Sequence, residues 1–377
     1  MRSTTSERGM HPNGRVRVAV LFGGQSEEHD VSLRSAQTVI GALDPTKYEI
    51  VPVGITRDGR WLAGGDPMRR LTAVSPLFAL APGTREPIPT DPSTDAVEPA
   101  AALPTVLNGE VDVVFPVLHG PMGEDGTVQG MLELAGLPYV GAGVLGSAVA
   151  MDKAIAKMIL AQAGLPQAPW LSVLRRDWEC EPDRVASEVA ERLGFPCFTK
   201  PANLGSSVGI SKVHDPSELA AGMAEAGRYD RKIVVERGID ARELEVSVLG
   251  NDDPIASIAG EIVPSNEFYD YHAKYVDDRS ALIVPADVPP EVMTRLQELA
   301  VAAFRALDLA GMARVDFFMD RNAGDLYVNE VNTIPGFTSI SMYPRLWAAS
   351  GLPIEDLVDR LIALAIERHH ERRRPLA

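Results

Sequence analysis

The sequence predicts an α/β protein of two or three domains, the first of which is an open α/β layer. Residues 16–22 form an apolar run that reads as a buried strand, and residues 31–43 carry apolar side chains at helical spacing after a double glycine. The segment "VDVVFPVLHG" reads as a further buried strand. A length of 377 residues exceeds what one hydrophobic core usually holds.

The rest of the first domain supports an open sheet. "YEIVPVGIT" predicts another strand, whereas residues 80–107 are rich in Pro, Thr, Ala and Asp and predict a long surface loop. Ligands of open α/β sheets bind at the carboxyl ends of the strands. The turns "GGQSEEHD" and "LHG" both follow strands, so we expect them to lie together at that edge.

The central region predicts one long helix and a strand pair. Residues 147–164, "SAVAMDKAIAKMILAQAG", read as a single helix that ends at Gly164, with Pro166 after it. The strand "FPCFTKPA" then leads into "NLGSSVGISKV", a turn rich in glycine and serine between two strands. Further on, residues 232–250 contain two strand runs, residues 264–284 a loop, and residues 290–307 a helix.

The composition narrows the classes of partner. A net charge of −16 and an isoelectric point near 4.9 argue against nucleic acid or an anionic membrane as the main partner. Cys180 and Cys197 lack metal-ligand spacing, and their scarcity fits a reducing compartment. No signal peptide or apolar run of transmembrane length is recognisable. We therefore expect a cytoplasmic protein.

The "GGQSEEHD" turn has an unusual charge for its place. A strand, a glycine turn and a helix usually receive a phosphate, because N–H groups at a helix N-terminus point at an anion. Here Glu27, Glu28 and Asp30 fill the turn, and these carboxylates would repel a phosphate. The plainer alternative is that the acids only stabilise the start of the helix.

The segment "ARVDFFMDRNAGDLYVNEVN" predicts a hairpin with a chemical face. Side chains alternate along a strand, so Arg314 shares a face with Asp316, and Glu330 shares one with Asn332. Two carboxylates and an amide are ligands suited to Mg²⁺ beside phosphate oxygens. An exposed polar strand face with a salt bridge is the alternative, but these residues interrupt otherwise apolar strands.

Two weaker signals point to a nucleotide. The loop after Lys200, with Ser206 and Ser207, could cover a polyphosphate, although such turns are often only turns. The segment 236–239 could offer backbone groups to an adenine, and Glu243 could bind a ribose. No G-x-x-x-x-G-K-[ST] motif occurs, so an ordinary P-loop enzyme is excluded.

In this order, the motifs resemble those of the ATP-grasp ligases, specifically the D-alanine–D-alanine ligases. The resemblance rests on "FGGQSEEHDVS", "LHGPMGEDGTVQGMLELAGLPYVG", "AMDK", "KPANLGSSVG", "YDYHAKY", "ARVDFF" and "NEVNTIPGFTSISMYP". It implies a three-unit fold with ATP held between the central and C-terminal units. The units expected are a disordered tail at 1–14, an N-terminal α/β substrate domain at 15–145, a central ATP-grasp subdomain at 146–236, and a C-terminal ATP-grasp subdomain at 237–368 with the metal and second-substrate site.

The resemblance also implies residue roles. ATP would be contacted by Lys153, Lys200, Ser206, Ser207, Glu236, Ile239, Glu243 and Lys274. Two Mg²⁺ ions, replaceable by Mn²⁺, would be held by Asp316, Glu330 and Asn332. Arg314 and the Gly336 N–H would stabilise the oxyanion of a tetrahedral intermediate. The first D-alanine would place its ammonium on Glu28, near His119, and the second would contact Ser341 and Met342. A network of Glu28, Ser206 and Tyr275 would complete the site.

The implied activity is the ATP-dependent ligation of two D-alanines through an acyl phosphate, for peptidoglycan precursors, cell-wall biogenesis and cell shape. The acidic turn then has a reason, since its ligand is a cation. The resemblance further implies a cytoplasmic homodimer with no nucleic acid or membrane partner. Three alternatives stay open: a D-alanine–D-lactate ligase, a catalytically dead ATP-grasp module that binds nucleotide, and a ligase for another amino acid.

Overall fold

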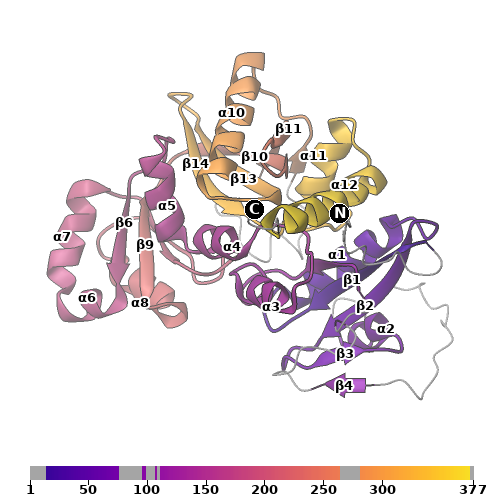
Figure 1. The fold of residues 1–377 in the computed structure, drawn as a ribbon. Helices are drawn as coiled ribbons and strands as arrows, with labels where there is room; N and C mark the ends of the chain where they lie inside the picture. The colour runs from indigo at the N-terminus through magenta and orange to yellow at the C-terminus, as the bar shows by residue number, and fades with distance from the viewer. Residues whose placement is uncertain (1–13, 76–95, 99–106, 108–110, 264–280, 374–377) are drawn as a thin grey trace, which may run out of the picture.

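The computed structural model describes residues 14–75, 96–98, 107, 111–263 and 281–373. These residues form three β-sheets, each built from strands that follow one another along the chain (Figure 1). The predicted α/β class is confirmed. The predicted tail, apart from Gly14, lies outside the described residues.

The first sheet has the strand order β4-β3-β2-β1-β5. Its strands are β1 (Val16–Gly23), β2 (Tyr48–Ile55), β3 (Trp61–Ala63), β4 (Ala96–Glu98) and β5 (Val113–Val117). β1 runs parallel to β2 and to β5, with Phe22 opposite Val117. The turns after β1 and β5 therefore start side by side, and Ser26 Oγ donates to His119 O at 2.6 Å. This confirms that both turns lie at one edge of the sheet.

Residues 80–107 are not only a loop. β4 pairs antiparallel with β3 and lengthens the first sheet. A three-residue strand is too short to show the alternation by which strands are recognised, which is why the sequence did not predict it. Apart from β4 and Leu107, the residues after Ser75 and before Val111 lie outside those described.

The second sheet is antiparallel throughout, with the order β6-β9-β7-β8. Its strands are β6 (Trp170–Leu174), β7 (Cys197–Pro201), β8 (Ser211–Val213) and β9 (Lys232–Arg237), and it carries the helices α6 (Arg175–Cys180), α7 (Pro182–Arg192) and α8 (Leu219–Tyr229). The glycine- and serine-rich turn joins β7 to β8, as predicted. Figure 1 shows this unit set apart from the first sheet.

The third sheet has the order β12-β11-β10-β13-β14. Its strands are β10 (Ala241–Gly250), β11 (Ile255–Val263), β12 (Ala281–Ile283), β13 (Gly311–Asp320) and β14 (Leu326–Asn332), and α10 (Pro290–Ala306) covers it. The predicted hairpin is confirmed as β13 and β14. The loop predicted at 264–284 is wrong at β12, a short strand that pairs with β11, and residues 264–280 lie outside those described.

The single helix predicted at 147–164 is wrong. The chain forms α4 (Val144–Met151) and α5 (Lys153–Gln162), separated by Asp152. Asp152 leaves the helical conformation, with φ −83° and ψ 98°, and its carboxylate accepts N–H groups from Ala154 and Ile155. Aspartate is a favoured N-cap because it satisfies N–H groups that a helix start leaves unpaired. α5 therefore starts afresh, with Lys153 in its first turn.

The remaining helices are α1 (His29–Ala42), α2 (Pro67–Thr72), α3 (Thr127–Ala135), α11 (Met342–Ala349) and α12 (Ile354–Arg372). α12 returns to the first sheet, where Leu357 and Leu361 share a core with Phe115. The ring of Phe337 also meets Phe115 edge to face, with centroids 6.0 Å apart. The first and third units are thus joined by a common hydrophobic core. None of the described helices is long and apolar enough to cross a membrane.

Candidate active site

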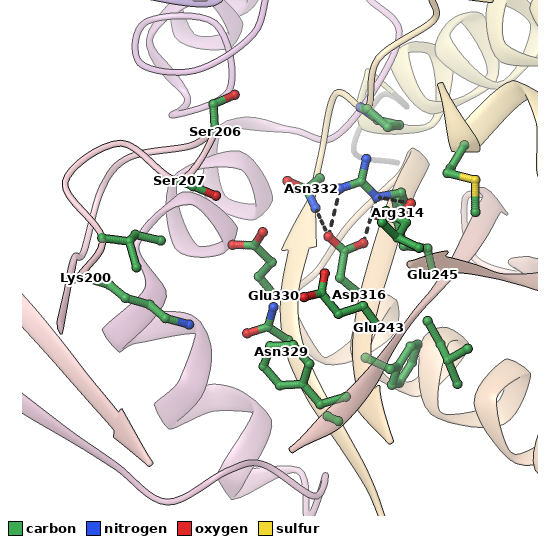
Figure 2. Close-up of a pocket in the computed structure, with 18 of the residues that line it drawn as sticks. Lys200, Ser206, Ser207, Glu243, Glu245, Arg314, Asp316, Asn329, Glu330 and Asn332 are labelled. Carbon is green, nitrogen blue, oxygen red and sulfur yellow. Dashed lines mark hydrogen bonds and ion pairs between the residues drawn. The ribbon is translucent and has the colours of Figure 1, made fainter. Parts of the chain in front are cut away.

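A cleft of about 940 Å³ takes walls from all three units. It brings together most of the predicted site residues, namely Glu28, His119, Lys200, Ser206, Ser207, Glu236, Ile239, Glu243, Arg314, Asp316, Glu330, Asn332, Gly336, Ser341 and Met342. Lys153 reaches it by its ion pair with Glu330 at 3.4 Å. Lys274 and Tyr275 lie outside the described residues. Figure 2 shows the hairpin side chains facing the loop that carries Ser206 and Ser207.

The hairpin holds its polar side chains on one face. β13 and β14 pair Arg314 with Asn332 and Asp316 with Glu330, as the alternation predicted. The register shifts after Asp316, so that Phe317 pairs with Val328 and Asn329 is an extra residue. Such a bulge bends a strand and re-aims its side chains. Here it lies directly beside Glu330 at the floor of the cleft.

Arg314 is held by two carboxylates. Its guanidinium donates to both oxygens of Asp316, at 2.7 and 2.8 Å, and pairs with Glu245 Oε2 at 3.0 Å (Figure 2). Burial opposes its charge, but the two carboxylates outweigh that effect and raise the pKa of Arg314 further. Asn332 Nδ2 also donates to Asp316 Oδ2, at 3.0 Å. Glu245 was not predicted, although its position two residues after Glu243 on a strand puts both on one face.

The donor set fits a magnesium ion that binds together with a phosphate. Asp316, Glu330 and Asn332 offer hard oxygen ligands on one face of the hairpin. Mg²⁺ is usually held by one or two carboxylates and keeps water and substrate phosphates as its other ligands. No group of three or more His, Cys, Asp or Glu side chains in the described part of the chain could hold a metal by itself. A metal held by protein groups alone fits less well.

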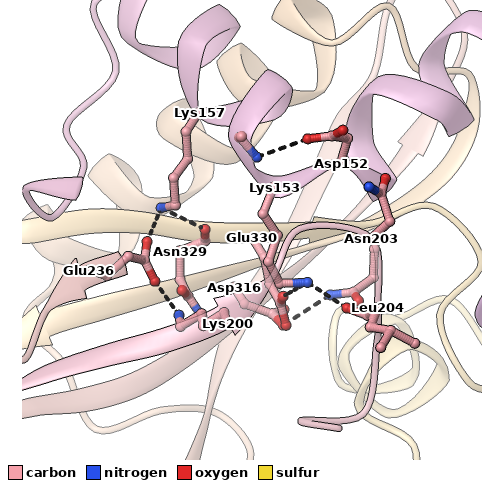
Figure 3. Close-up of polar contacts among 12 residues, drawn as sticks. Asp152, Lys153, Lys157, Lys200, Asn203, Leu204, Glu236, Asp316, Asn329 and Glu330 are labelled. Atoms are coloured by element: carbon pink, nitrogen blue, oxygen red, sulfur yellow. Dashed lines mark hydrogen bonds and ion pairs between the residues drawn. The ribbon is translucent and has the colours of Figure 1, made fainter. Parts of the chain in front are cut away.

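A buried triad of charges lies on the opposite wall. The carboxylate of Glu236, on β9, pairs with Lys200 from β7 and with Lys157 from α5 (Figure 3). Burial opposes ionisation of Glu236, but the two ammonium groups outweigh it and lower its pKa to about 2. Lys157 Nζ also donates to Asn329 O at 3.4 Å, at the bulge of the hairpin. The triad therefore ties the second unit to the third.

Sequence reasoning missed Lys157. It lies one helical turn after Lys153, so both lysines share a face of α5. Lys153 donates to Leu204 O at 2.6 Å, whereas Lys157 is only 3 % exposed. The available signal was the spacing of four residues between the lysines of "DKAIAK", which places both side chains on the same face of a helix. A lysine in an amphipathic helix is usually solvent-exposed, so the sequence alone offered little reason to expect a buried ion pair here.

The acidic turn and the serine loop meet across the cleft. Ser206 Oγ donates to Glu28 Oε1, although the two residues are 178 positions apart. Gly120 and Gly205 both approach this carboxylate, since a Cβ on either would lie 3.1 or 3.2 Å from Glu28 Oε2. Ser206 and Ser207 have φ values of 50° and 60°, a left-handed backbone that is unfavourable for serine. The loop thus keeps a strained shape beside Glu28.

The segment after β14 forms the last wall. Ser341 Oγ accepts the N–H of Thr338 at 3.0 Å and starts α11, with Met342 buried behind it. A Cβ at Gly336 would lie 2.8 Å from Ser341 Oγ, so only glycine fits there without displacement. Glu124, which sequence reasoning also missed, accepts the N–H of Ile334 at 3.1 Å. Burial, with Glu28 nearby, raises the pKa of Glu124 to about 8.

Two family models match the chain. Residues 17–142 match the family described as "D-ala D-ala ligase N-terminus", and residues 159–363 match "D-ala D-ala ligase C-terminus". The two matches together span all three sheets.

Curated relatives and solved structures agree with these matches. The D-alanine–D-alanine ligase of Heliobacterium modesticaldum is 51% identical over 95% of this chain and 96% of its own length. That of a Thermoanaerobacter species is 54% identical over 94% of this chain and 98% of its own. The D-alanine–D-alanine ligase structure from Coxiella burnetii has a TM-score of 0.77 at 38% identity, covering 95% and 96% of the two chains. The VanG D-Ala:D-Ser ligase from Enterococcus faecalis has a TM-score of 0.80 at 37% identity, covering 93% and 99%.

Proposed function

The chain belongs to the D-alanine–D-alanine ligase family, and from this premise we propose that it joins two D-alanines through an acyl phosphate at the expense of ATP. The product, D-alanyl-D-alanine, serves peptidoglycan precursor synthesis. One observation carries the proposal. A single cleft holds a carboxylate suited to an ammonium, a hairpin suited to phosphate and metal, and the Gly336 backbone.

The first D-alanine binds through its ammonium to Glu28. The carboxylate of Glu28 is held in the cleft by the Ser206 hydroxyl, which donates to Oε1, and its charge attracts the substrate ammonium. A charge-assisted hydrogen bond between this ammonium and Glu28 fixes the orientation of the amino acid in the cleft. The carboxylate of the substrate then faces the space between the wall that carries Lys200 and the hairpin that carries Arg314.

In the first step an oxygen of that carboxylate attacks the γ-phosphorus of ATP. The bond from this phosphorus to the β–γ bridging oxygen breaks, so ADP leaves and an acyl phosphate forms. Lys153 and Lys200 place positive charge beside the transferring group, which is how phosphoryl transfer is chiefly accelerated. Ile239 and Glu243 line the same cleft. We expect them to contact the nucleoside.

In the second step the neutral amine of the second D-alanine attacks the acyl carbon. The Gly336 N–H and the Arg314 guanidinium stabilise the oxyanion of the tetrahedral intermediate. The carbon–oxygen bond to phosphate then breaks, the amine nitrogen loses a proton, and inorganic phosphate leaves. Ser341 and Met342 border the space for this second substrate.

Asp316, Glu330 and Asn332 would hold the magnesium ions that accompany ATP. When bound, such ions neutralise phosphate charge and orient the γ-phosphoryl group. Arg314 pairs with both oxygens of Asp316, and Glu245 gives the guanidinium a second partner at 3.0 Å.

Two further properties belong to the proposal. A homodimer in the cytoplasm is expected for this biosynthetic role, and the two free cysteines, Cys180 and Cys197, agree with a reducing compartment. Light scattering of the purified protein tests the dimer, and fractionation of cells tests the location.

The deciding experiment is product analysis with competing nucleophiles. Purified protein is incubated with ATP, Mg²⁺ and D-alanine, with D-lactate or D-serine added at equal concentration, and the products are measured by mass spectrometry beside ADP. The expected result is mainly D-alanyl-D-alanine, in a one-to-one ratio with ADP. A predominance of the lactate or serine product contradicts the choice of second substrate. Absence of ADP formation identifies a nucleotide-binding module without activity.

A further inference from the structure

The 334–337 loop is held by the first unit through three backbone groups. Ile334 N–H donates to Glu124 Oε1 at 3.1 Å, and Ile334 O lies 3.0 Å from His119 Nδ1. Phe337 N–H donates to Ser35 Oγ at 3.1 Å. Ser35 lies on α1, more than 300 residues away in sequence and fully buried. The loop that carries Gly336 is therefore shaped by the unit that binds the first substrate.

The partners of His119 determine where its proton lies. Ile334 O can only accept, so His119 Nδ1 carries hydrogen and donates to it. Burial lowers the pKa of His119 and keeps the ring neutral, so Nε2 is an acceptor. Ser35 Oγ, 3.2 Å from Nε2, must then be the donor in that contact. A closed ring results: Phe337 N–H to Ser35, Ser35 O–H to His119, and His119 N–H to Ile334 O.

This ring leaves one donor of the loop available. Pro335 has no N–H, and the N–H groups of Ile334 and Phe337 are both bonded. No group among the described residues accepts from the Gly336 N–H, which borders the cleft. The ring of Phe337, packed on Phe115, keeps the end of the loop from turning. The orientation of the Gly336 N–H is thus set by what Ser35 and His119 hold on either side of it.

We propose that Ser35 is a positioning residue for the second half-reaction, which aims the Gly336 N–H at the acyl oxygen through its bonds to Phe337 and His119. The inference rests on the proposed ligase function and deepens it. Ser35 does not line the cleft, so it acts only through the loop. The first step takes place at phosphorus and gives the acyl oxygen no new charge, so a misaimed Gly336 should slow the second step alone.

The test is Ser35→Ala in single-turnover quench-flow, with ADP and dipeptide measured from the same samples. ADP formation should stay within about threefold of wild type, whereas dipeptide formation should slow about tenfold or more, as expected when an oxyanion donor is misplaced. Because the stalled acyl phosphate hydrolyses, ADP released per dipeptide should rise above one. A variant with equal slowing of both products and a ratio of one overturns the proposal, as does a variant that matches wild type.

Ser32→Ala is the matched control. Ser32 is equally buried on α1, but its hydroxyl accepts from Gly23 N–H at 2.8 Å and donates to Val117 O, away from the 334–337 loop. The Ser32→Ala variant should be destabilised about as much as Ser35→Ala, while it still forms ADP and dipeptide in a one-to-one ratio. If Ser35→Ala melts below the assay temperature, Ser35→Cys keeps the volume with a weaker donor and acceptor and should also raise the ratio.

The same data separate this inference from the function on which it rests. Wild type that makes dipeptide in step with ADP while Ser35→Ala keeps that ratio overturns only the role of Ser35. Wild type that makes no dipeptide overturns the ligase function and this inference together.

Discussion

The two sides of the cleft are held together by different interactions. On the phosphate side, formed by the Lys157–Glu236–Lys200 triad and the Arg314–Asp316 pair, buried and half-buried charges neutralise one another. On the acyl side, formed by the 334–337 loop and its supports, neutral groups make a ring of hydrogen bonds through Ser35 and His119. A charged side chain can exchange its protein partner for a ligand group that has the same sign as that partner. The neutral ring of hydrogen bonds has no charge for a ligand to attract, so it stays closed.

This difference separates two kinds of preparation for catalysis. The phosphate side must bind ATP, a polyanion, together with its metal cations. Its charged side chains therefore pair with one another until the ligand replaces one partner of a pair. The acyl side must stabilise a charge that exists only in the transition state, so its neutral donor, the Gly336 N–H that acts there together with Arg314, must already be in place. The substitutions that follow test whether the two sides of the cleft act independently.

The largest effect is expected for Glu330→Gln. This change removes one carboxylate from the donor set and the ion pair with Lys153 at 3.4 Å, with little change in volume. Ligation should fall on the order of 1000-fold or more, since metal assistance contributes several kcal/mol to the transition state. Steady-state assays give the loss, and calorimetry should show weaker Mg²⁺-dependent binding of ATP.

Asp320→Asn controls for damage to the hairpin. Asp320 accepts the N–H groups of Asn322 and Ala323 in the hairpin turn, at 2.7 and 2.8 Å, and an asparagine can do the same. This variant should keep near-normal turnover. If Glu330→Gln also turned over normally at ordinary Mg²⁺, Glu330 would not be a metal ligand.

A smaller effect, on stability rather than turnover, is expected for Glu236→Gln. The pKa of Glu236 falls to about 2 in the folded chain from about 4.5, so its ionised form stabilises the fold above pH 4.5. This difference corresponds to about 3 kcal/mol. The contribution is lost as pH falls from the unfolded pKa through the folded one. The variant should therefore be destabilised at pH 6, where two buried lysines lose their counter-charge.

Urea unfolding at two pH values checks this linkage. The destabilisation caused by Glu236→Gln should be about 1 kcal/mol smaller at pH 3.5 than at pH 6. A difference that does not change with pH would mean that Glu236 is not stabilised as an anion by its lysines. Glu261→Gln is a useful comparison, because Glu261 is also buried but pairs with Arg242 away from the triad.

The contrast also explains what could be predicted from the sequence. The hairpin was predictable because alternation along strands places Asp316 opposite Glu330 once a turn is recognised. Glu28 was predictable because its charge opposes what its turn normally binds. Family resemblance then supplied the roles of both.

Other features depend on contacts between distant segments and were not predictable. Ser35 is one small residue on the buried face of a helix. Its proposed role depends on the hydrogen bond that it accepts from Phe337 N–H, which is distant in sequence. Glu124 reads as an acid in a glycine-rich loop until Ile334 meets it. The helix break at Asp152 was missed because the residues on both sides favour a helix, and the capping bonds decide where one helix ends. Lys274 and Tyr275, outside the described residues, remain predictions.

The smallest effect tests whether the acyl side is independent of the Glu28–Ser206 contact, which serves the first substrate. Ser206 donates to Glu28, so the two should act as one unit on the first substrate. Glu28→Gln should raise the KM for the first D-alanine about 10- to 100-fold, because a hydrogen bond to a charged group contributes about 1.5–3 kcal/mol. Ser206→Ala should raise it several-fold, and the double variant should lose less than the sum of both. Ser207→Ala, with the same left-handed backbone, should change the KM for ATP instead.

Combining Ser206→Ala with Ser35→Ala should give additive losses, since Ser206 holds the first substrate and Ser35 positions a hydrogen-bond donor for the second step. Strict additivity between Ser206 and Glu28 would show that their contact does not serve substrate binding. Strong coupling between Ser206 and Ser35 would show that the acyl side and the Glu28–Ser206 contact work as a single rigid body.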